Sequence, residues 1–259
     1  MTMKGLLIKD YYCLKKSLKS FLVLTIGVII IGIMFAISME HGNMAMVAAE
    51  TAVQSGVDEA TAFDMFRVAV WLVIIIPMAF VGNVVDCFKA DMRAEFGKQL
   101  FSLPVDSKQI VAARYLTCII YALVSFVGAT ITAICISSAS EQYPFSELMS
   151  VVVLFGSVMI IYLCIVMCLI YLIGVKYADY IQAAPLLIIM IVAVVFSNVK
   201  MMNMNEAEMD SLMANMWGTV KGFMTQNVGI FLLVAVVMLV ITYFVSVQIV
   251  EKRRGKAIC

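Results

Sequence analysis

Six long stretches of the chain contain no Asp, Glu, Lys or Arg and consist mainly of aliphatic and aromatic residues. A helix needs about 20 apolar residues to cross the hydrocarbon core of a bilayer, and each stretch is close to or above that length. The stretches are Phe21–Met39, Val68–Val85, Tyr115–Ser140, Leu148–Val175, Tyr180–Val199 and a run within Gly222–Val250. The pattern predicts an all-α, polytopic membrane protein with six transmembrane helices, forming a single transmembrane domain over residues 1–259.

The residues before the first stretch follow a different pattern, with apolar side chains on one face of a helix and lysines elsewhere. The apolar positions are Leu7, Tyr11, Leu14 and Leu18, and the lysines are Lys4, Lys15 and Lys19. This spacing predicts an amphipathic helix over residues 1–20 that lies in the membrane interface. A simple basic anchor beside the membrane would occupy the same surface, and the sequence leaves both interpretations open.

Positive charge is distributed unevenly among the segments that flank the six stretches. With the N-terminus inside, fifteen of the 18 Lys and Arg residues fall in cytoplasmic segments, and only Arg67, Lys200 and Lys221 fall outside. Cytoplasmic segments of membrane proteins carry an excess of Lys and Arg, so both termini are expected on the cytoplasmic side. The loops on the other side are acidic, and we interpret them as solvated caps rather than as a cation-binding vestibule.

Composition agrees with a membrane protein, because 64% of the 259 residues are hydrophobic and only 14% are charged. Soluble domains contain about 45–50% apolar and about 25% charged residues. The net charge of +1 gives no indication of a nucleic-acid partner, and we expect none. Most of the seven cysteines lie inside apolar stretches, which argues against a disulfide framework. We interpret Cys164 and Cys168, which share a helix face, as packing residues rather than metal ligands.

The longest predicted cytoplasmic loop, residues 86–114, has a helical pattern of its own. Apolar residues recur at roughly helical spacing from Phe88 onwards, and Pro104 ends the pattern because the residue before a proline avoids helical geometry. Asp106 or Ser107 can then cap a second helix that leads into the third span. The loop is therefore predicted to form a helix, a sharp turn and a second helix, which together make a rigid cytoplasmic elbow.

Two segments of the chain resemble a known family. Residues 3–12 read MKGLLIKDYY and residues 103–115 read LPVDSKQIVAARY, and both resemble segments of ABC-2 type permeases. The six spans, the cytoplasmic termini and the position of the elbow are also similar to that family, in particular to the short permeases of phenol-soluble modulin exporters. The resemblance implies a permease subunit in a bacterial plasma membrane that exports amphipathic or membrane-active peptides, or similar hydrophobic solutes.

The same resemblance implies two partners besides the lipid bilayer: a second permease copy, identical or related, and a separate ATPase subunit that binds ATP and Mg²⁺. In the family, a coupling helix between spans two and three docks on that ATPase, and here it corresponds to residues 91–101. The residues implied in docking are Asp91, Arg93, Glu95, Phe96, Lys98, Leu100 and Phe101. In the alternative interpretation, the two phenylalanines anchor the elbow in the lipid interface.

Several other functions are disfavoured by the residues that the chain lacks. It contains no P-loop, since Gly97-Lys98 is followed by glutamine, and its only histidine is His41. No predicted span carries an ionisable residue near its centre, which argues against a proton-coupled carrier and against an intramembrane protease. We therefore expect no catalytic residues, no directly bound cofactor and no metal site in this chain. An ion-coupled carrier or channel that works without an ATPase is the alternative, and a membrane-embedded enzyme is the third possibility.

Polar and aromatic residues within the spans are candidates for a substrate path, which the pattern alone does not locate. The candidates are Asn83, Ser125, Thr130, Thr132, Tyr162, Tyr171 and Gln182. In hydrocarbon, such side chains bond preferentially to neighbouring helices. We therefore expect most of them to serve packing between helices.

Overall fold

A computed structural model describes residues 3–41, 46–47, 50, 59–93, 106–141, 143–202 and 206–258 of the chain. Within these residues the chain is helical, with short turns and no strand, which confirms the predicted all-α fold. The α-helices are α1 (Met3–His41), α3 (Glu59–Ala79), α4 (Val85–Arg93), α6 (Ser107–Ala139), α7 (Phe145–Ile173), α8 (Ala178–Met202) and α9 (Glu206–Ile258). Two 3-10 helices, η1 (Phe80–Val84) and η2 (Val175–Tyr177), precede α4 and α8 respectively.

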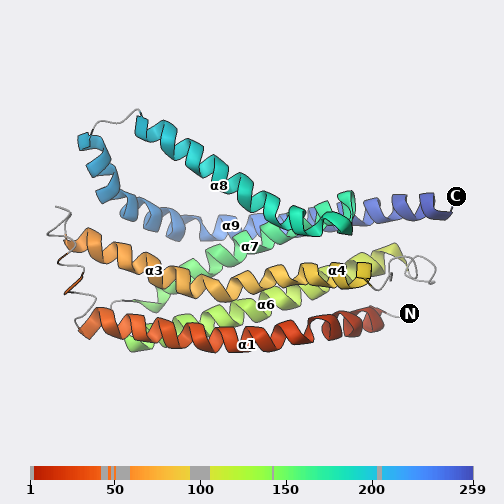
Figure 1. Ribbon diagram of the computed structural model, residues 1–259, viewed down its shortest axis with the longest axis horizontal. Coiled ribbons are helices and arrows are strands. Elements are labelled where there is room, and N and C mark those ends of the chain that lie inside the picture. Colours follow the sequence, from red (N-terminus) through yellow and green to blue (C-terminus); the bar gives the residue numbers. More distant parts are fainter. Residues whose placement is uncertain are drawn as a thin grey trace.

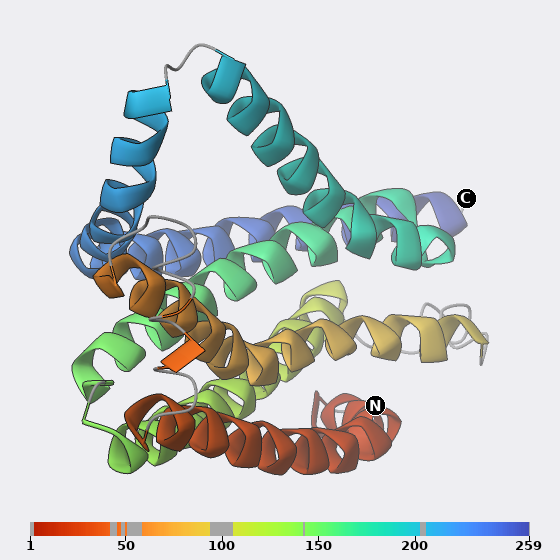
Figure 2. The same cartoon turned by 60° about the vertical axis from the view of Figure 1, so that its left-hand side comes forward.

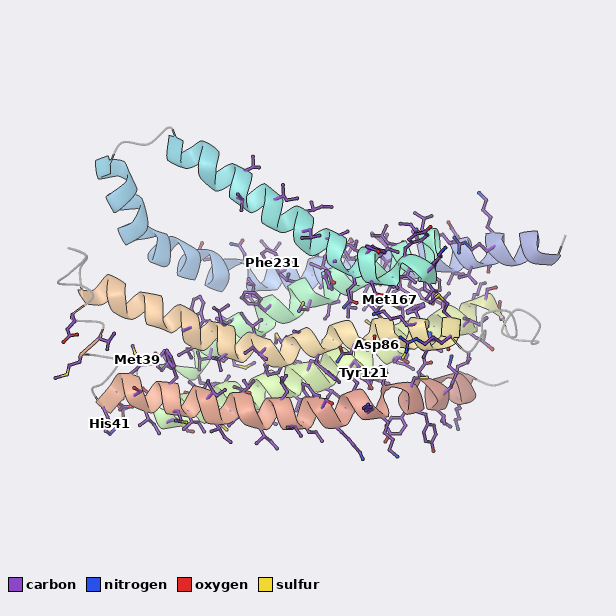
Figure 3. All side chains as sticks on the ribbon, viewed as in Figure 1. Met39, His41, Asp86, Tyr121, Met167 and Phe231 are labelled. Carbon is purple, nitrogen blue, oxygen red and sulfur yellow. The ribbon has the colours of Figure 1, made fainter. Side chains whose placement is uncertain are left out.

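The helices α1, α3, α6 and α7 and the long part of α9 run side by side, and both chain termini lie at the same end of the bundle (Figure 1). The first turns of α1, the whole of α4, the start of α6 and the end of α9 also lie at this end. We call it the basic end, because these elements contain Lys9, Lys89, Lys108, Arg114 and Arg253. In Figure 3, Met39 and His41 lie at the opposite end of the bundle from Asp86.

Five helices in the described part of the chain are long and apolar enough to cross a membrane. They are Lys4–His41, Ala69–Arg93, Ser107–Ala139, Phe145–Ile173 and Gln226–Arg253. These five correspond to five of the predicted spans. The other predicted span, Tyr180–Val199, falls within α8, whose 25 residues rise by about 37 Å and so match the thickness of a bilayer.

The helix α1 differs from the prediction at its N-terminal end. It runs without interruption over 39 residues, so residues 3–20 and the first span do not form two separate helices. Neither glycine nor proline occurs between Leu6 and Gly27, and therefore nothing in the sequence breaks the helix there. The predicted apolar face was right at Leu14, which is buried, but wrong in part, because Asp10 is buried as well whereas Tyr11 is 52% exposed. The packed face thus includes an acidic residue, which finds its partners on other helices.

The second span continues into the predicted elbow. Pro77 lies inside α3, the tighter η1 follows, and α4 then carries the helical chain as far as Arg93. On the far side of the elbow, the carboxylate of Asp106 accepts a bond from the backbone N–H of Lys108 at 3.4 Å and caps α6, so Asp106 is the cap out of the two predicted candidates, Asp106 and Ser107. Residues 94–105, which join α4 to this cap, lie outside the described residues.

Aromatic and small residues determine how α1, η1 and α6 pack near the basic end. The ring of Phe80 lies between those of Phe21 and Tyr121, with centroids 4.3 Å and 5.4 Å away. A Cβ at Gly128 would lie only 2.8 Å from the Phe21 ring, so this glycine allows α1 and α6 to approach closely. The three elements therefore form one rigid block behind the charged residues described below.

The helices α8 and α9 separate at the end away from the termini. Figure 2 shows α8 diverging from α7, and the first turns of α9 running at a large angle to its long remainder. The remainder of α9 packs along α7. Apolar side chains nevertheless remain exposed on both helices, among them Ile188, Ile191, Ile230, Leu233 and Val236. These faces are suited to contact with lipid or with another membrane helix.

Candidate functional site

Charged residues from α1, α4 and α6 meet inside the basic end of the bundle. Nη1 of Arg114 lies 2.7 Å from Oδ1 of Asp10, and Nη2 of Arg114 donates to Oδ2 of Asp91. Asp10 is only 2% exposed and Arg114 only 5%. A guanidinium that donates to two carboxylates at once fixes both of them in position. Arg114 therefore links three helices that lie far apart in the sequence.

Lys9 and Thr117 complete this group of residues. Nζ of Lys9 lies 2.6 Å from Oδ1 of Asp91 and 3.5 Å from Oδ1 of Asp10. The hydroxyl of Thr117 lies 3.2 Å from Oδ2 of Asp10. Two cations thus balance two carboxylates. A buried charge without a partner is costly in free energy, and each charged side chain of this group has a partner of opposite charge. We call Lys9, Asp10, Asp91, Arg114 and Thr117 the ion network.

Aromatic contacts connect the ion network to α7. Cζ of Arg114 lies 4.9 Å from the centroid of the Phe88 ring, which places the cation over the electron-rich face of the ring. Phe88 meets the ring of Tyr171 edge to face, with centroids 5.4 Å apart. Phe88 and Asp91 are three residues apart on α4, so one face of this short helix makes both contacts.

A second ion pair connects α4 to α8. Nζ of Lys89 lies 2.5 Å from Oδ1 of Asp179 and 3.4 Å from Oδ1 of Asp86. The side chain of Asp179 is 79% exposed, so this pair is expected to contribute at most about 1 kcal/mol. Its position still matters, because it holds the start of α8 beside the same short helix.

The short helix α4 is therefore in contact with α1, α6, α7 and α8. It has only nine residues, and the chain continues from its last residue, Arg93, directly into residues 94–105. A force applied beyond Arg93 acts on Asp91 within one helical turn, and through Asp91 on Arg114 and Asp10. Because the bond between Arg114 and Asp10 is buried and the bond between Arg114 and Asp91 is partly buried, the helices that they join are expected to move together rather than slide past one another.

The residues implied in docking fall partly within the described residues. Asp91 takes part in the ion network, and Arg93 is exposed at the end of α4. The others, Glu95, Phe96, Lys98, Leu100 and Phe101, lie outside the described residues. The structure thus connects the predicted docking segment, at its first residue, to the membrane helices.

Sequence reasoning did not identify Lys9, Asp10 or Arg114 as a site. Lys9 and Arg114 were counted only as basic residues of cytoplasmic segments. The position of Arg114 directly before the predicted third span was not taken as a sign of a site. One signal was present: Asp10 lies four residues from Leu6 and four from Leu14, and both leucines are buried. An acidic residue within such an apolar stripe indicates a buried partner of opposite charge.

A second feature is a largely apolar cavity of about 400 Å³ among α3, α6, α7 and α9. Ser125 lines it, and the Ser125 hydroxyl has no hydrogen-bond partner among the described residues. Two other candidates for the substrate path bond to neighbouring elements instead. Asn83 donates to the hydroxyl of Ser17 at 2.8 Å, and the Tyr162 hydroxyl donates to the carbonyl of Gln182 at 2.6 Å.

The helices and their charged connections define a polytopic helical membrane protein with a buried ion network at one end. Residues 60–251 match the sequence model of a family described as ABC-2 family transporter protein. The match covers most of the chain, and the chain belongs to this family. It is therefore the membrane-spanning permease component of an ABC transporter. No curated protein and no solved structure matches the chain.

The family match also relates to the two segments that resemble ABC-2 permeases. It includes residues 103–115 and the network residues Asp91 and Arg114, whereas residues 3–12 lie before its start. The ion network thus joins the matched region to the N-terminal segment through Lys9 and Asp10.

Proposed function

We propose that this permease belongs to an exporter, that it works with a separate ATPase subunit, and that it moves amphipathic or membrane-active peptides outwards. The observation that carries the proposal is the ion network. It joins the helix leading into the elbow to the first and third membrane helices. The resemblance to short permeases of phenol-soluble modulin exporters supports a peptide substrate. ATP and Mg²⁺ are assigned to the ATPase subunit.

In this proposal the ATPase docks on the elbow, and its motion reaches the spans through α4. Docking involves Phe96 and Phe101 as apolar contacts and Arg93, Glu95 and Lys98 as polar contacts. When the ATPase moves the elbow, Asp91 shifts and carries Arg114 with it. The start of α6 then follows together with α1, which rearranges the spans around the substrate. Such a connection suits this role because Asp91 lies only two residues before the end of α4, so that little of the motion is lost before it reaches Arg114.

The apolar cavity supports a hydrophobic or amphipathic substrate. Its walls are formed almost entirely by aliphatic and aromatic side chains, and Ser125 and Ser157 are among its few polar residues. The Ser157 hydroxyl is already bonded to the Val153 carbonyl at 2.8 Å, whereas the buried Ser125 hydroxyl has no partner among the described residues. Such a lining matches the apolar face of an amphipathic helix better than a hydrated ion.

We also infer that two permeases pair in the membrane, as identical or related copies. Six spans leave few helices to enclose a path for a bulky solute. The apolar faces of α8 and α9 offer surfaces for a second copy, for example at Ile191 and Leu233. Cross-linking in native membranes that yields only monomer, even with the ATPase present, would count against pairing.

The distribution of basic residues supports a plasma-membrane orientation with both termini in the cytoplasm. A cysteine introduced at Gly56 should therefore react with a membrane-impermeant thiol reagent in intact cells, whereas one introduced at Lys98 should not. The test is done in a chain with Cys13→Ser and Cys259→Ser, because Cys13 is exposed. Labelling at position 98 but not at position 56 would show that the orientation is the opposite one.

The proposal is tested by ATP hydrolysis after reconstitution of the chain with its ATPase in proteoliposomes. An amphipathic helical peptide should stimulate hydrolysis by the wild-type pair. Asp91→Asn removes the charge that Arg114 and Lys9 hold, so this stimulation should fall by about ten-fold, as expected for the loss of a charge-assisted contact.

The matched control for this experiment is Asp86→Asn. It changes the same residue type on α4, but Asp86 is exposed and lies outside the ion network. In this variant, the peptide should stimulate ATP hydrolysis as strongly as in the wild type. Transport of a solute that is driven by an ion gradient and needs neither ATP nor the peptide would instead support the ion-coupled carrier.

A further inference from the structure

A second cavity, of about 180 Å³, lies at the basic end between α4, α6, the end of α7 and α9. Arg253 of α9 and Tyr171 of α7 line it together with Arg114 and Asp91 of the ion network. The other lining residues are apolar or glycine: Phe88, Ile110, Ile170, Gly174, Val175 and Val250. Cationic and apolar groups thus share a small cavity at one end of the membrane helices.

Arg253 is held in place while most of its donors stay available. Its Nη2 donates to the backbone carbonyl of Leu172 at 2.7 Å, near the last turn of α7. A guanidinium has five N–H donors, so several remain for a ligand. In the described part of the chain no carboxylate pairs with Arg253, and the residue is exposed. Arg253 therefore contributes an uncompensated positive charge to the cavity.

The hydroxyl of Tyr171 is a second, independent indication of a ligand. It is buried and has no hydrogen-bond partner among the described residues. Buried hydroxyl groups are nearly always bonded, and an orphaned one requires an explanation such as a missing ligand. The ring is fixed by its edge-to-face contact with Phe88, so the hydroxyl cannot turn freely to a distant partner.

The remaining charges around the cavity leave one positive charge in excess. Asp91 faces the cavity, but Arg114 and Lys9 both bond to its carboxylate. Arg114 in turn bonds to Asp10. The four charges of the ion network cancel, and the charge of Arg253 is left over. An anion that enters the cavity is thus attracted by Arg253 and is not opposed by an unpaired carboxylate.

We propose that this cavity binds the phosphate group of an anionic phospholipid. Arg253 pairs with the phosphate, and the Tyr171 hydroxyl donates a hydrogen bond to it. Apolar walls formed by residues such as Ile170 and Val250 receive the adjoining glycerol and the first acyl carbons. Basic pockets between membrane helices near the cytoplasmic surface are suited to such headgroups. The lipid links α9 to α7 and to α4.

Native mass spectrometry of the purified chain from nanodiscs tests this assignment. The nanodiscs contain phosphatidylglycerol and phosphatidylcholine in equal amounts, and wild-type chain should retain phosphatidylglycerol preferentially. Arg253→Gln keeps an N–H donor but removes the charge, and should lower the retention of phosphatidylglycerol by about ten-fold. Tyr171→Phe removes only the hydroxyl and should lower it by a smaller factor.

The matched control is Lys252→Gln, which removes the same charge from the neighbouring exposed position of α9. It should retain lipid as the wild type does. Equal loss in Lys252→Gln and Arg253→Gln would show a diffuse charge effect and overturn the site. Equal retention of both lipids by the wild type would overturn it as well. If millimolar inorganic phosphate displaces the lipid, the cavity is a site for soluble phosphate, and the assignment to a phospholipid is wrong.

Discussion

Replacing Arg114 by leucine should destabilise the folded chain by about 3–5 kcal/mol, the cost of leaving a buried charge without its partner. Asp10 is almost completely buried and would keep only the more distant Lys9 and a threonine hydroxyl. Asp91 would retain Lys9 as its partner. The loss should appear as a lower unfolding temperature in detergent, measured with a thiol-reactive dye that detects buried cysteines such as Cys118 as they become accessible.

Two further variants make this result specific to the ion network. Lys108→Leu removes an exposed basic residue from the first turn of the same helix and should leave the unfolding temperature nearly unchanged. Arg114→Leu combined with Asp10→Leu removes both partners, and it should recover part of the lost stability because apolar groups then replace the buried pair. An Arg114→Leu variant as stable as the wild type would show that the network contributes nothing to the fold.

The second large effect is expected at the elbow. Phe96→Ala combined with Phe101→Ala removes two aromatic side chains that are implied in ATPase docking. Loss of such contacts typically costs about 2 kcal/mol or more, so the ATPase should bind at least roughly 30-fold more weakly. The chain should still insert normally, since the membrane-spanning helices are unchanged. Binding of purified, labelled ATPase to the permease in nanodiscs measures the change.

The matched control for the elbow is Tyr11→Ala combined with Tyr12→Ala. It removes two aromatic residues that are exposed on α1 at the same end of the bundle. These variants should bind the ATPase as the wild type does. If the elbow variant binds normally and the α1 variant does not, then the elbow is a lipid anchor and the N-terminal helix provides the docking surface.

The parts of the fold that depend on local pattern could be predicted from the sequence. The bilayer requires long apolar helices, so the spans could be recognised from the absence of charge alone. The cap at Asp106 could be predicted because a short acidic side chain after Pro104 suits the first turn of a helix. The helix from Val85 to Arg93 was predicted as part of the loop and not as a continuation of the second span, because Asp86 ends the charge-free stretch.

The site was harder to predict, because its members lie far apart in the sequence. Asp10 and Arg114 are 104 positions apart, and nothing local indicates that they meet. The face of α1 was assigned from its leucines and Tyr11, and an acidic residue was not expected on the packed side. Asp91 was named for its place in the docking segment, whereas its contacts with Arg114 and Lys9 depend on how three helices pack.

If this permease works with a separate ABC ATPase, the two proteins should be isolated together. The affinity-tagged chain is purified from its native membranes under mild detergent, and the proteins that co-purify are identified by mass spectrometry. We expect an ATPase subunit with a P-loop in near-stoichiometric amount, and much less of it with the chain that carries both Phe96→Ala and Phe101→Ala. Recovery of the intact, folded chain without any ATPase, while it still transports its substrate, would show that the permease works alone.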